Sequence, residues 1–177
     1  MKLSTAIAFS LSLALGALDM LVPSDAQANP LNGTYVIKDS KQAQKTIDQA
    51  IERTVSDVSR LFRGKARDAL KSRQRLCPKL SLAIASDATI TCVTAGRSVS
   101  APSSGASKKV KGKDGKTAHI SHKPSGNRLV QTIKGENGTS KVTYTLSADG
   151  KTLTLSVHMS SSKLDTPLRF SLTYIRS

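Results

Sequence analysis

Aromatic side chains and cysteines are scarce in this sequence. Its 177 residues include no Trp, three Phe and three Tyr. So few aromatic rings argue against RNA readers that stack bases on aromatic side chains. Two cysteines are also too few for a disulfide-dense small scaffold or a cysteine-rich zinc module.

Acidic residues are few as well, and common catalytic motifs are missing. Twelve Asp and Glu stand against 27 Lys and Arg, which gives a formal net charge of +15. The sequence has no Gly-x-Ser-x-Gly, no His-Glu-x-x-His and no Gly-rich phosphate loop. Its three imidazoles are His119, His122 and His158, and the first two would point to opposite faces of a strand, the wrong geometry for one metal ion. We therefore expect no enzyme, no metal site and no cofactor.

One long apolar run is present, and it lies near the N-terminus. Lys2 precedes the apolar stretch 3–18, and Ala26-Gln27-Ala28 has the small-x-small pattern of a signal peptide cleavage site. A membrane anchor is the alternative, but the stretch is shorter than the roughly 20 residues that a spanning helix needs. We expect residues 1–28 to be a cleaved signal peptide and residues 29–177 to form a single domain. The mature protein is then periplasmic or secreted, without integral membrane association.

Export changes how the two cysteines are interpreted. In an oxidising compartment Cys77 and Cys92 can pair, whereas in a cytosol thiols would persist. A reactive thiol pair is the alternative, but the spacing is not Cys-x-x-Cys and no obvious helix N-terminus lies nearby to lower a thiol pKa. We predict a structural disulfide between Cys77 and Cys92, which contributes roughly 3 kcal/mol in the loop-entropy model.

The first half of the expected mature chain predicts a helix. From Ser40 to about Leu70 the apolar residues recur every three or four positions, which is typical of one long amphipathic helix. Asp39 or Ser40 can cap its start, because their side-chain oxygens can accept the N–H groups of the first turn. Gly64 is the position where we expect any bend.

Beyond Cys77 the apolar residues alternate with polar ones, which predicts antiparallel strands packed on one face only. The segment 98–127, rich in Ser, Gly and Lys, is expected to be mostly loop. Strands are expected at 80–85, 89–93, 142–146, 153–159 and 168–174, with less regular ones at 117–121 and 128–133, and hairpin connections at Ser86-Asp87-Ala88 and Ala148-Asp149-Gly150. Closing such a sheet into a barrel or half-barrel hides its apolar face and limits exposed edges.

Two stretches carry a resemblance to a known family. Leu31-Asn32-Gly33-Thr34-Tyr35-Val36-Ile37 opens the domain, and the ending runs from Tyr144 through Asp149-Gly150-Lys151 to Pro167-Leu168-Arg169-Phe170. Together they resemble an uncharacterised group of small exported bacterial proteins with a lipocalin-like (calycin-type) barrel. The resemblance implies an α+β fold, mainly antiparallel β, with about 7–9 strands and one long N-terminal helix.

The same resemblance implies how the barrel end closes. In lipocalins a Gly-x-Trp near the first strand packs against an Arg near the last strand. Here Gly33 and Tyr35 would take the first role and Arg176 the second, with Tyr standing where the family has Trp, which weakens the cation–π contact.

We expect a non-enzymatic exported barrel that binds a small hydrophobic ligand or a lipid. Whether the interior is hollow stays open, since Leu61, Phe62 and Leu70 of the expected helix could fill it. The alternative is a basic interaction module that docks onto lipid headgroups, an acidic polysaccharide or nucleic acid, although the lysines could equally be solvated residues that protect a strand edge. The candidate anion-binding residues are Arg60, Arg63, Arg67, Lys71, Arg73, Arg75, Lys108, Lys109, Lys111 and Lys113.

Overall fold

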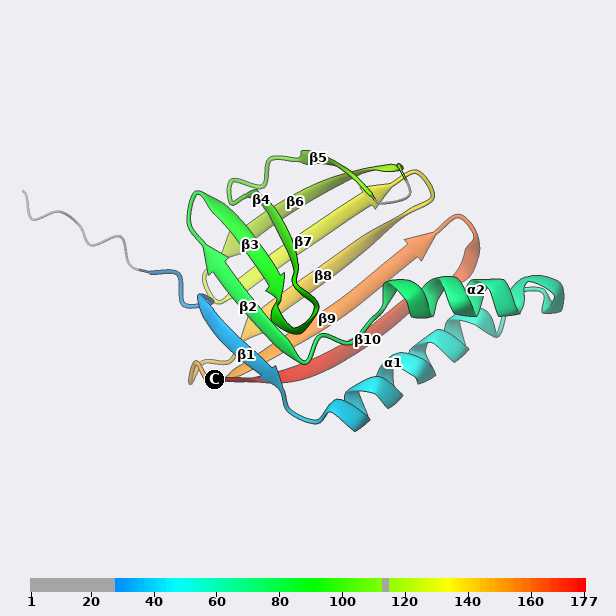
Figure 1. The fold of residues 1–177 in the computed structure, drawn as a ribbon, viewed down its shortest axis with the longest axis horizontal. Coiled ribbons are helices and arrows are strands. Elements are labelled where there is room, and N and C mark those ends of the chain that lie inside the picture. The colour runs from blue at the N-terminus through cyan, green and yellow to red at the C-terminus, as the bar shows by residue number, and fades with distance from the viewer. Residues whose placement is uncertain (1–27, 113–114) are drawn as a thin grey trace, which may run out of the picture.

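The computed structural model describes residues 28–112 and 115–177, so the expected signal peptide lies outside the described residues except for its last residue. Ten strands and two α-helices follow one another in the described chain (Figure 1). Their bounds are β1 (Gly33–Ile37), α1 (Ser40–Val55), α2 (Arg60–Arg73), β2 (Lys79–Ile84), β3 (Asp87–Cys92), β4 (Arg97–Pro102), β5 (Lys108–Lys111), β6 (Thr117–Ser125), β7 (Arg128–Gly135), β8 (Gly138–Leu146), β9 (Thr152–Ser161) and β10 (Leu164–Arg176). Neither described helix has the length and apolar character needed to cross a bilayer.

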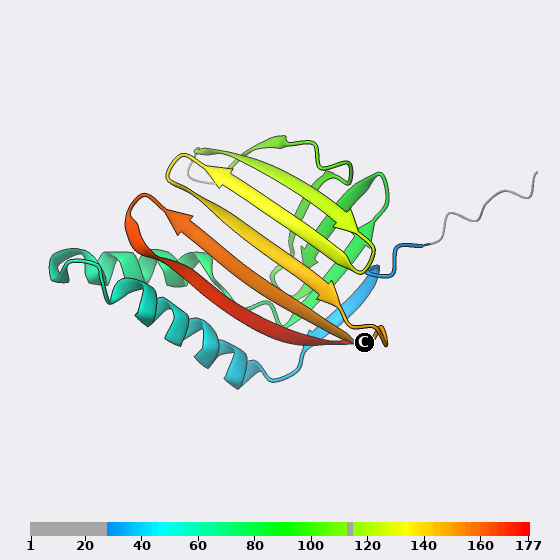
Figure 2. The same ribbon diagram turned by 180° about the vertical axis from the view of Figure 1, so that it is seen from behind.

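All ten strands belong to one antiparallel sheet in the order β4-β3-β2-β1-β10-β9-β8-β7-β6-β5. The sheet curls so that β2, β3 and β4 lie in front of β6 to β9, with the helices along the side next to β10 (Figures 1 and 2). β4 and β5 are the two ends of the sheet and do not pair, but β4 packs against β6. The result is a nearly closed barrel, in agreement with the expected fold class.

The strand number exceeds the expected 7–9, because β4 and β5 lie in the segment 98–127 that we expected to be mostly loop. The only apolar residues at their inward positions are Val99 and Ala101 on β4 and Val110 on β5, since Arg97 and Lys108 also have inward parity, so the apolar alternation is too short to stand out. Pairing with β3 and β6 supplies the backbone hydrogen bonds that hold these polar segments extended.

The expected long helix is in fact two helices, and the break falls at residues 56–59 rather than at Gly64. Arg63 donates to the carbonyls of Ser56 (Nη2, 2.6 Å) and Val58 (Nε, 3.3 Å), which satisfies groups left unpaired where α1 ends. Asp57 also accepts a hydrogen bond from the Thr166 hydroxyl of β10, which ties the turn to the sheet and lowers the pKa of the carboxyl group. These tertiary contacts reverse the direction of the chain between the two helices. The recurrence of apolar residues every three or four positions gives no sign of a break there.

The start of α1 agrees with the sequence. The backbone N–H of Gln42 donates to Asp39 Oδ1 at 2.9 Å, so Asp39 is the N-cap. The face of α1 that carries Ala43, Ile47, Ile51 and Val55 is buried and belongs to the same hydrophobic core as the barrel interior. α1 therefore closes one side of the barrel as part of its core.

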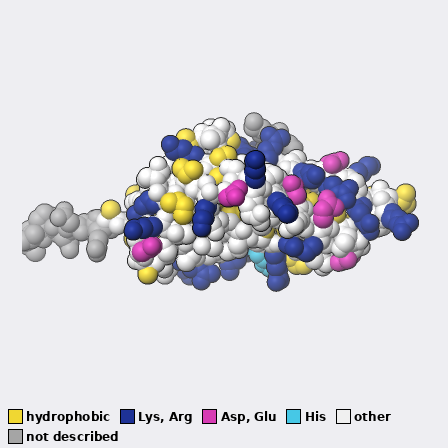
Figure 3. All heavy atoms as spheres, turned by 90° about the horizontal axis from the view of Figure 1, so that it is seen from below, with side chains coloured by type: hydrophobic (Ala, Val, Ile, Leu, Met, Phe, Trp, Pro, Cys, Tyr) yellow, Lys and Arg dark blue, Asp and Glu magenta, His cyan; other side chains and the backbone are white. Residues whose placement is uncertain are grey.

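α2 contributes much less to the core than expected. Leu70 is its one fully buried residue, at 4% exposure, whereas Leu61 and Phe62 are 85% and 60% exposed. The expectation that Leu61 and Phe62 could fill the barrel is therefore wrong, because the turn before α2 projects its first residues away from the sheet. In Figure 3 the helical end of the molecule shows hydrophobic side chains beside Lys and Arg.

The strand faces agree with the predicted alternation. Phe170 pairs with Val157 and Leu172 pairs with Leu155, so all four share the inner face. Val157 and Leu172 are buried, and Leu155 and Phe170 are partly buried against the core. The hairpin expected around residue 150 is present, and Gly150 supplies the positive φ of +71° that the turn requires.

Candidate functional site

The barrel interior is the main candidate site. The strand register places one apolar side chain after another on the inner face, and these side chains join α1 in one continuous core. The large buried side chains that the strands contribute include Tyr35, Leu82, Leu129, Tyr144, Leu153, Leu168 and Tyr174. An apolar lining with a few polar groups is the usual chemistry of a site for a hydrophobic molecule.

A series of hydrogen-bonded polar groups crosses the interior near the gap between β4 and β5, the two end strands that do not pair. His122 on β6 is fully buried, and its Nδ1 lies 2.6 Å from the carbonyl oxygen of Ala88 on β3. Because a carbonyl can only accept, Nδ1 carries the proton, and Nε2 then accepts from the Gln131 side-chain amide at 3.0 Å. Burial lowers the pKa of His122, while the bond to Ala88 and the charge of Asp87 oppose that shift. A neutral imidazole thus links the two facing halves of the sheet.

Two tyrosine hydroxyls add further neutral polar groups to the interior. The Tyr174 hydroxyl donates to the Cys77 carbonyl at 3.0 Å, and burial raises its pKa to about 12. Burial raises the pKa of Tyr144 too, with a smaller contribution from Tyr174. Both phenols therefore stay protonated at physiological pH. Sequence reasoning did not single out His122, Gln131, Tyr144 or Tyr174 as interior polar groups, although their inward parity on the strands is a signal that could have found them.

The three residues expected to close the barrel end lie together. The Arg176 guanidinium carbon is 5.3 Å from the centre of the Tyr35 ring, and Nη2 donates to the Tyr35 hydroxyl at 2.7 Å. Arg176 also donates to the carbonyls of Pro30 and Asn32. Gly33 lies beneath the guanidinium with a φ of +148°, a conformation that residues with a side chain rarely adopt.

Cys77 and Cys92 form a disulfide, with their Cα atoms 5.7 Å apart. The bond joins the segment after α2 to the end of β3. It lies close to the Tyr174 hydroxyl through the Cys77 carbonyl, so it fixes the loop beside the barrel interior.

The residues expected to bind an anion do not form one patch. Arg63 is used in the turn between the helices, and Arg67 forms a bidentate pair with Glu52 at 2.7 Å that lowers the pKa of that carboxyl group. Arg60, Lys71 and Arg73 on α2, and Arg75 two residues beyond its end, are exposed. Lys108, Lys109 and Lys111 lie on β5, an edge of the sheet far from α2 in both ribbon views, and Lys113 lies outside the described residues.

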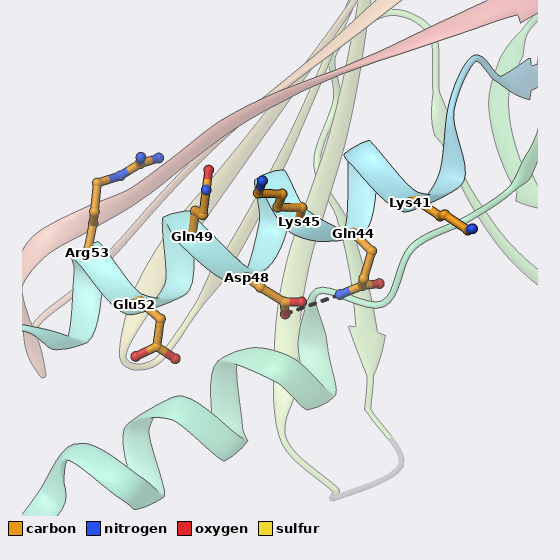
Figure 4. Close-up of a pocket in the computed structure, with 7 residues that line it drawn as sticks. All are labelled: Lys41, Gln44, Lys45, Asp48, Gln49, Glu52 and Arg53. Carbon is orange, nitrogen blue, oxygen red and sulfur yellow. Dashed lines mark hydrogen bonds between the residues drawn. The ribbon is translucent and has the colours of Figure 1, made fainter.

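A shallow open depression lies along the exposed side of α1 (Figure 4). Gln44, Asp48 and Glu52 lie on the side facing α2, whereas Lys45 and Arg53 point away from it. Gln44 donates to Asp48 at 3.2 Å, an ordinary contact along a helix surface. These flexible solvated side chains supply no converging set of groups for a ligand. Within the described residues, no three His, Cys, Asp or Glu side chains are grouped as a metal site would require.

No protein-family model and no curated protein matches the chain. Solved structures are similar in fold. A fatty acid transporter designated REP1-NXSQ is 15% identical, with a TM-score of 0.53 over 83% of this chain and 96% of that one. A fatty-acid-binding protein from Drosophila melanogaster brain is 14% identical, with a TM-score of 0.51 over 83% and 99% of the two chains. Fatty-acid-binding protein 1 of Echinococcus granulosus is 12% identical, with a TM-score of 0.52 over 83% and 97%. At these identities the likeness shows the fold, a calycin-type barrel.

Proposed function

We propose that this protein is an exported, non-enzymatic carrier that binds a small hydrophobic ligand or a lipid inside its barrel. The observation that carries the proposal is the inner face, where apolar side chains from both halves of the sheet surround a few neutral polar groups. The neutral imidazole of His122 and the phenols of Tyr144 and Tyr174 can meet a polar end of such a ligand without the cost of burying a charge. The names of the structurally similar proteins, which are fatty acid carriers, support the same function.

The ligand would displace side chains that now pack together in the core. α2 is the element that yields most easily, because it buries little besides Leu70. We therefore place the entrance beside α2, where the fewest apolar contacts must open.

Native mass spectrometry of the protein released intact from its own compartment tests this proposal. We expect a retained mass that disappears on organic extraction, and renewed binding of a fluorescent long-chain fatty acid to the extracted protein. Val142→Trp places bulk on the inner face of β8 and should abolish that binding, whereas Thr143→Trp, one residue along on the outer face, should not. Binding that is equal in both variants, with both folded by circular dichroism, would contradict an interior site.

Export is part of the proposal and has its own test. N-terminal sequencing of the protein recovered outside the cytoplasm should begin at Asn29. A chain that retains residues 1–28 and sediments with membranes would support an anchor instead.

A second function, docking onto an anionic lipid surface, is favoured by the start of α2. Leu61 and Phe62 are among the most exposed large apolar side chains that the structure describes, and the exposed Arg60 directly precedes them. Apolar side chains that enter the headgroup boundary next to cations that contact lipid phosphates are typical of interfacial helices. The basic α2 could therefore bring the barrel to a membrane that supplies its ligand.

Co-sedimentation with phosphatidylglycerol vesicles tests this docking. Leu61→Ser with Phe62→Ser should weaken binding about tenfold, since two buried apolar side chains contribute more than 1.4 kcal/mol. Val36→Ser with Ile175→Ser is the matched control, because these residues are 40% and 39% exposed on the barrel instead. Equal loss of binding in the two double variants would exclude the start of α2 as the membrane contact.

A further inference from the structure

The outer face of β5 to β10 is unusual in its charges. None of the positions paired between neighbouring strands of this half of the sheet is Asp or Glu. Outward positions on these strands carry many cations, whereas the acids in the described part of the chain lie in the helices, in the turns and near strand ends. We name this surface the cationic outer face and define it by Lys109, Lys123, Arg128, Lys134, Lys141 and Arg169.

The strand register sets these cations in rows across the sheet. Lys141 on β8 pairs with His158 on β9, which pairs with Arg169 on β10. In the neighbouring row Lys109 pairs with His119, and His119 with Lys134. Since adjacent strands are about 4.8 Å apart, each row presents basic side chains at intervals that a repeating anionic chain can follow.

Hydroxyl groups fill the positions beside these rows. Ser156 and Ser171 pair across β9 and β10, and their Oγ atoms lie 2.9 Å apart. Because both are small, they leave a shallow depression flanked by His158 and Arg169. The cations of the face are not neutralised within the protein, because the one ion pair that the structure gives for the described residues joins Arg67 to Glu52.

The composition of the face argues against single-stranded nucleic acid and a membrane as partners. No Phe or Tyr occupies its outward positions, so nucleic acid bases have no ring on which to stack. Its one exposed large apolar side chain is Ile175, 39% exposed near the end of β10, whereas Leu61 and Phe62 at the start of α2 are 85% and 60% exposed, so a membrane contact fits α2 better than this face. Figure 2 shows the face in full view, with both helices at its edge.

We propose that the cationic outer face binds an anionic polysaccharide that lies across β6 to β10. Lys134, Lys141 and Arg169 would contact carboxylate or sulfate groups, and the Ser and Thr hydroxyls would exchange hydrogen bonds with sugar hydroxyls. This inference does not depend on a ligand in the barrel, because the interior and exterior positions of each strand are distinct. It also moves the expected anion site from α2 onto the strands, and of the residues expected to bind an anion only Lys109 is among those that define this face.

Binding to heparin, measured from 50 to 400 mM NaCl, tests the proposal. The triple variant Lys134→Gln, Lys141→Gln and Arg169→Gln should weaken binding about tenfold or more and flatten the salt dependence, since fewer counterions are released. The control Lys41→Gln, Lys45→Gln and Arg73→Gln removes the same charge from exposed helical positions and should change binding less than about threefold. Both variants should keep the wild-type melting temperature.

Two results would overturn the proposal. Equal weakening by the two triple variants means that net charge alone attracts heparin. Stronger, face-dependent binding to duplex DNA or to phosphatidylglycerol vesicles than to heparin means that the occupant is not a polysaccharide.

Discussion

Arg176 is the residue whose contacts span the longest stretch of sequence at the barrel end. It contacts Tyr35, Pro30 and Asn32, which lie more than 140 positions earlier in the chain. We expect Arg176→Gln to lower the free energy of unfolding by about 1–3 kcal/mol, because several charge-assisted hydrogen bonds are lost together. Arg169→Gln, an outward substitution on the same strand, should stay within about 0.5 kcal/mol. Urea unfolding measures both, and similar effects would mean that the end closure contributes little.

His122 should make stability depend on pH. Its pKa in the folded protein lies below the ordinary 6.5 because it is buried, so the unfolded chain binds the proton more tightly. Stability is therefore fully present above pH 6.5 and falls as the pH drops toward the folded pKa. We expect the urea midpoint to decrease from pH 7 to pH 5, and His122→Leu to flatten that change at some cost in overall stability. A slope that His122→Leu leaves unaffected would assign the effect to other groups.

Among the elements, the loop between α2 and β2 depends most on a covalent link. The Cys77–Cys92 disulfide joins this loop to β3, and the Cys77 carbonyl accepts a hydrogen bond from the Tyr174 hydroxyl. We expect Cys77→Ser with Cys92→Ser to lower stability by about 2–5 kcal/mol. Thiol titration of the denatured, unreduced protein from its native compartment should find no free thiol, and two titratable thiols would mean that the bond does not form in the cell.

The elements also show what a sequence can and cannot predict. Strong alternation, as in β9 and β10, predicted both the strands and their inner faces, because each apolar residue there has a buried position to occupy. β4 and β5 escaped prediction because they have few apolar residues and are held by their neighbours. The helix break at 56–59 escaped for a related reason, since it depends on Arg63 and Thr166, which contact the turn only once the chain has folded.

At the scale of the whole molecule, the face of the strand on which a residue lies decides which candidate site it joins, more than any sequence motif does. The pairing of Gly33, Tyr35 and Arg176 came from a resemblance, and the structure brings these three together. The anion site expected from charge clusters is scattered instead, because a run such as Lys108–Lys111 alternates between the two faces of β5. Charge density along the chain therefore did not predict charge density on the surface, which the register of β5 to β10 creates.

The packing of the whole molecule also predicts the order in which its parts open. α1 shares one hydrophobic core with the barrel strands, whereas the first two turns of α2 bury no side chain fully. Amide protection follows local burial, so α1 should exchange hydrogen about as slowly as β9 and β10, and residues 60–67 should exchange many-fold faster. Hydrogen exchange with peptide-level mass spectrometry measures this. If a fatty acid enters beside α2, adding it should slow exchange in α2 more than in β5, one of the two end strands of the sheet. Uniform slowing throughout the chain would indicate global stabilisation by the ligand, and slow exchange of 60–67 without ligand would show that α2 is held by contacts stronger than its burial implies.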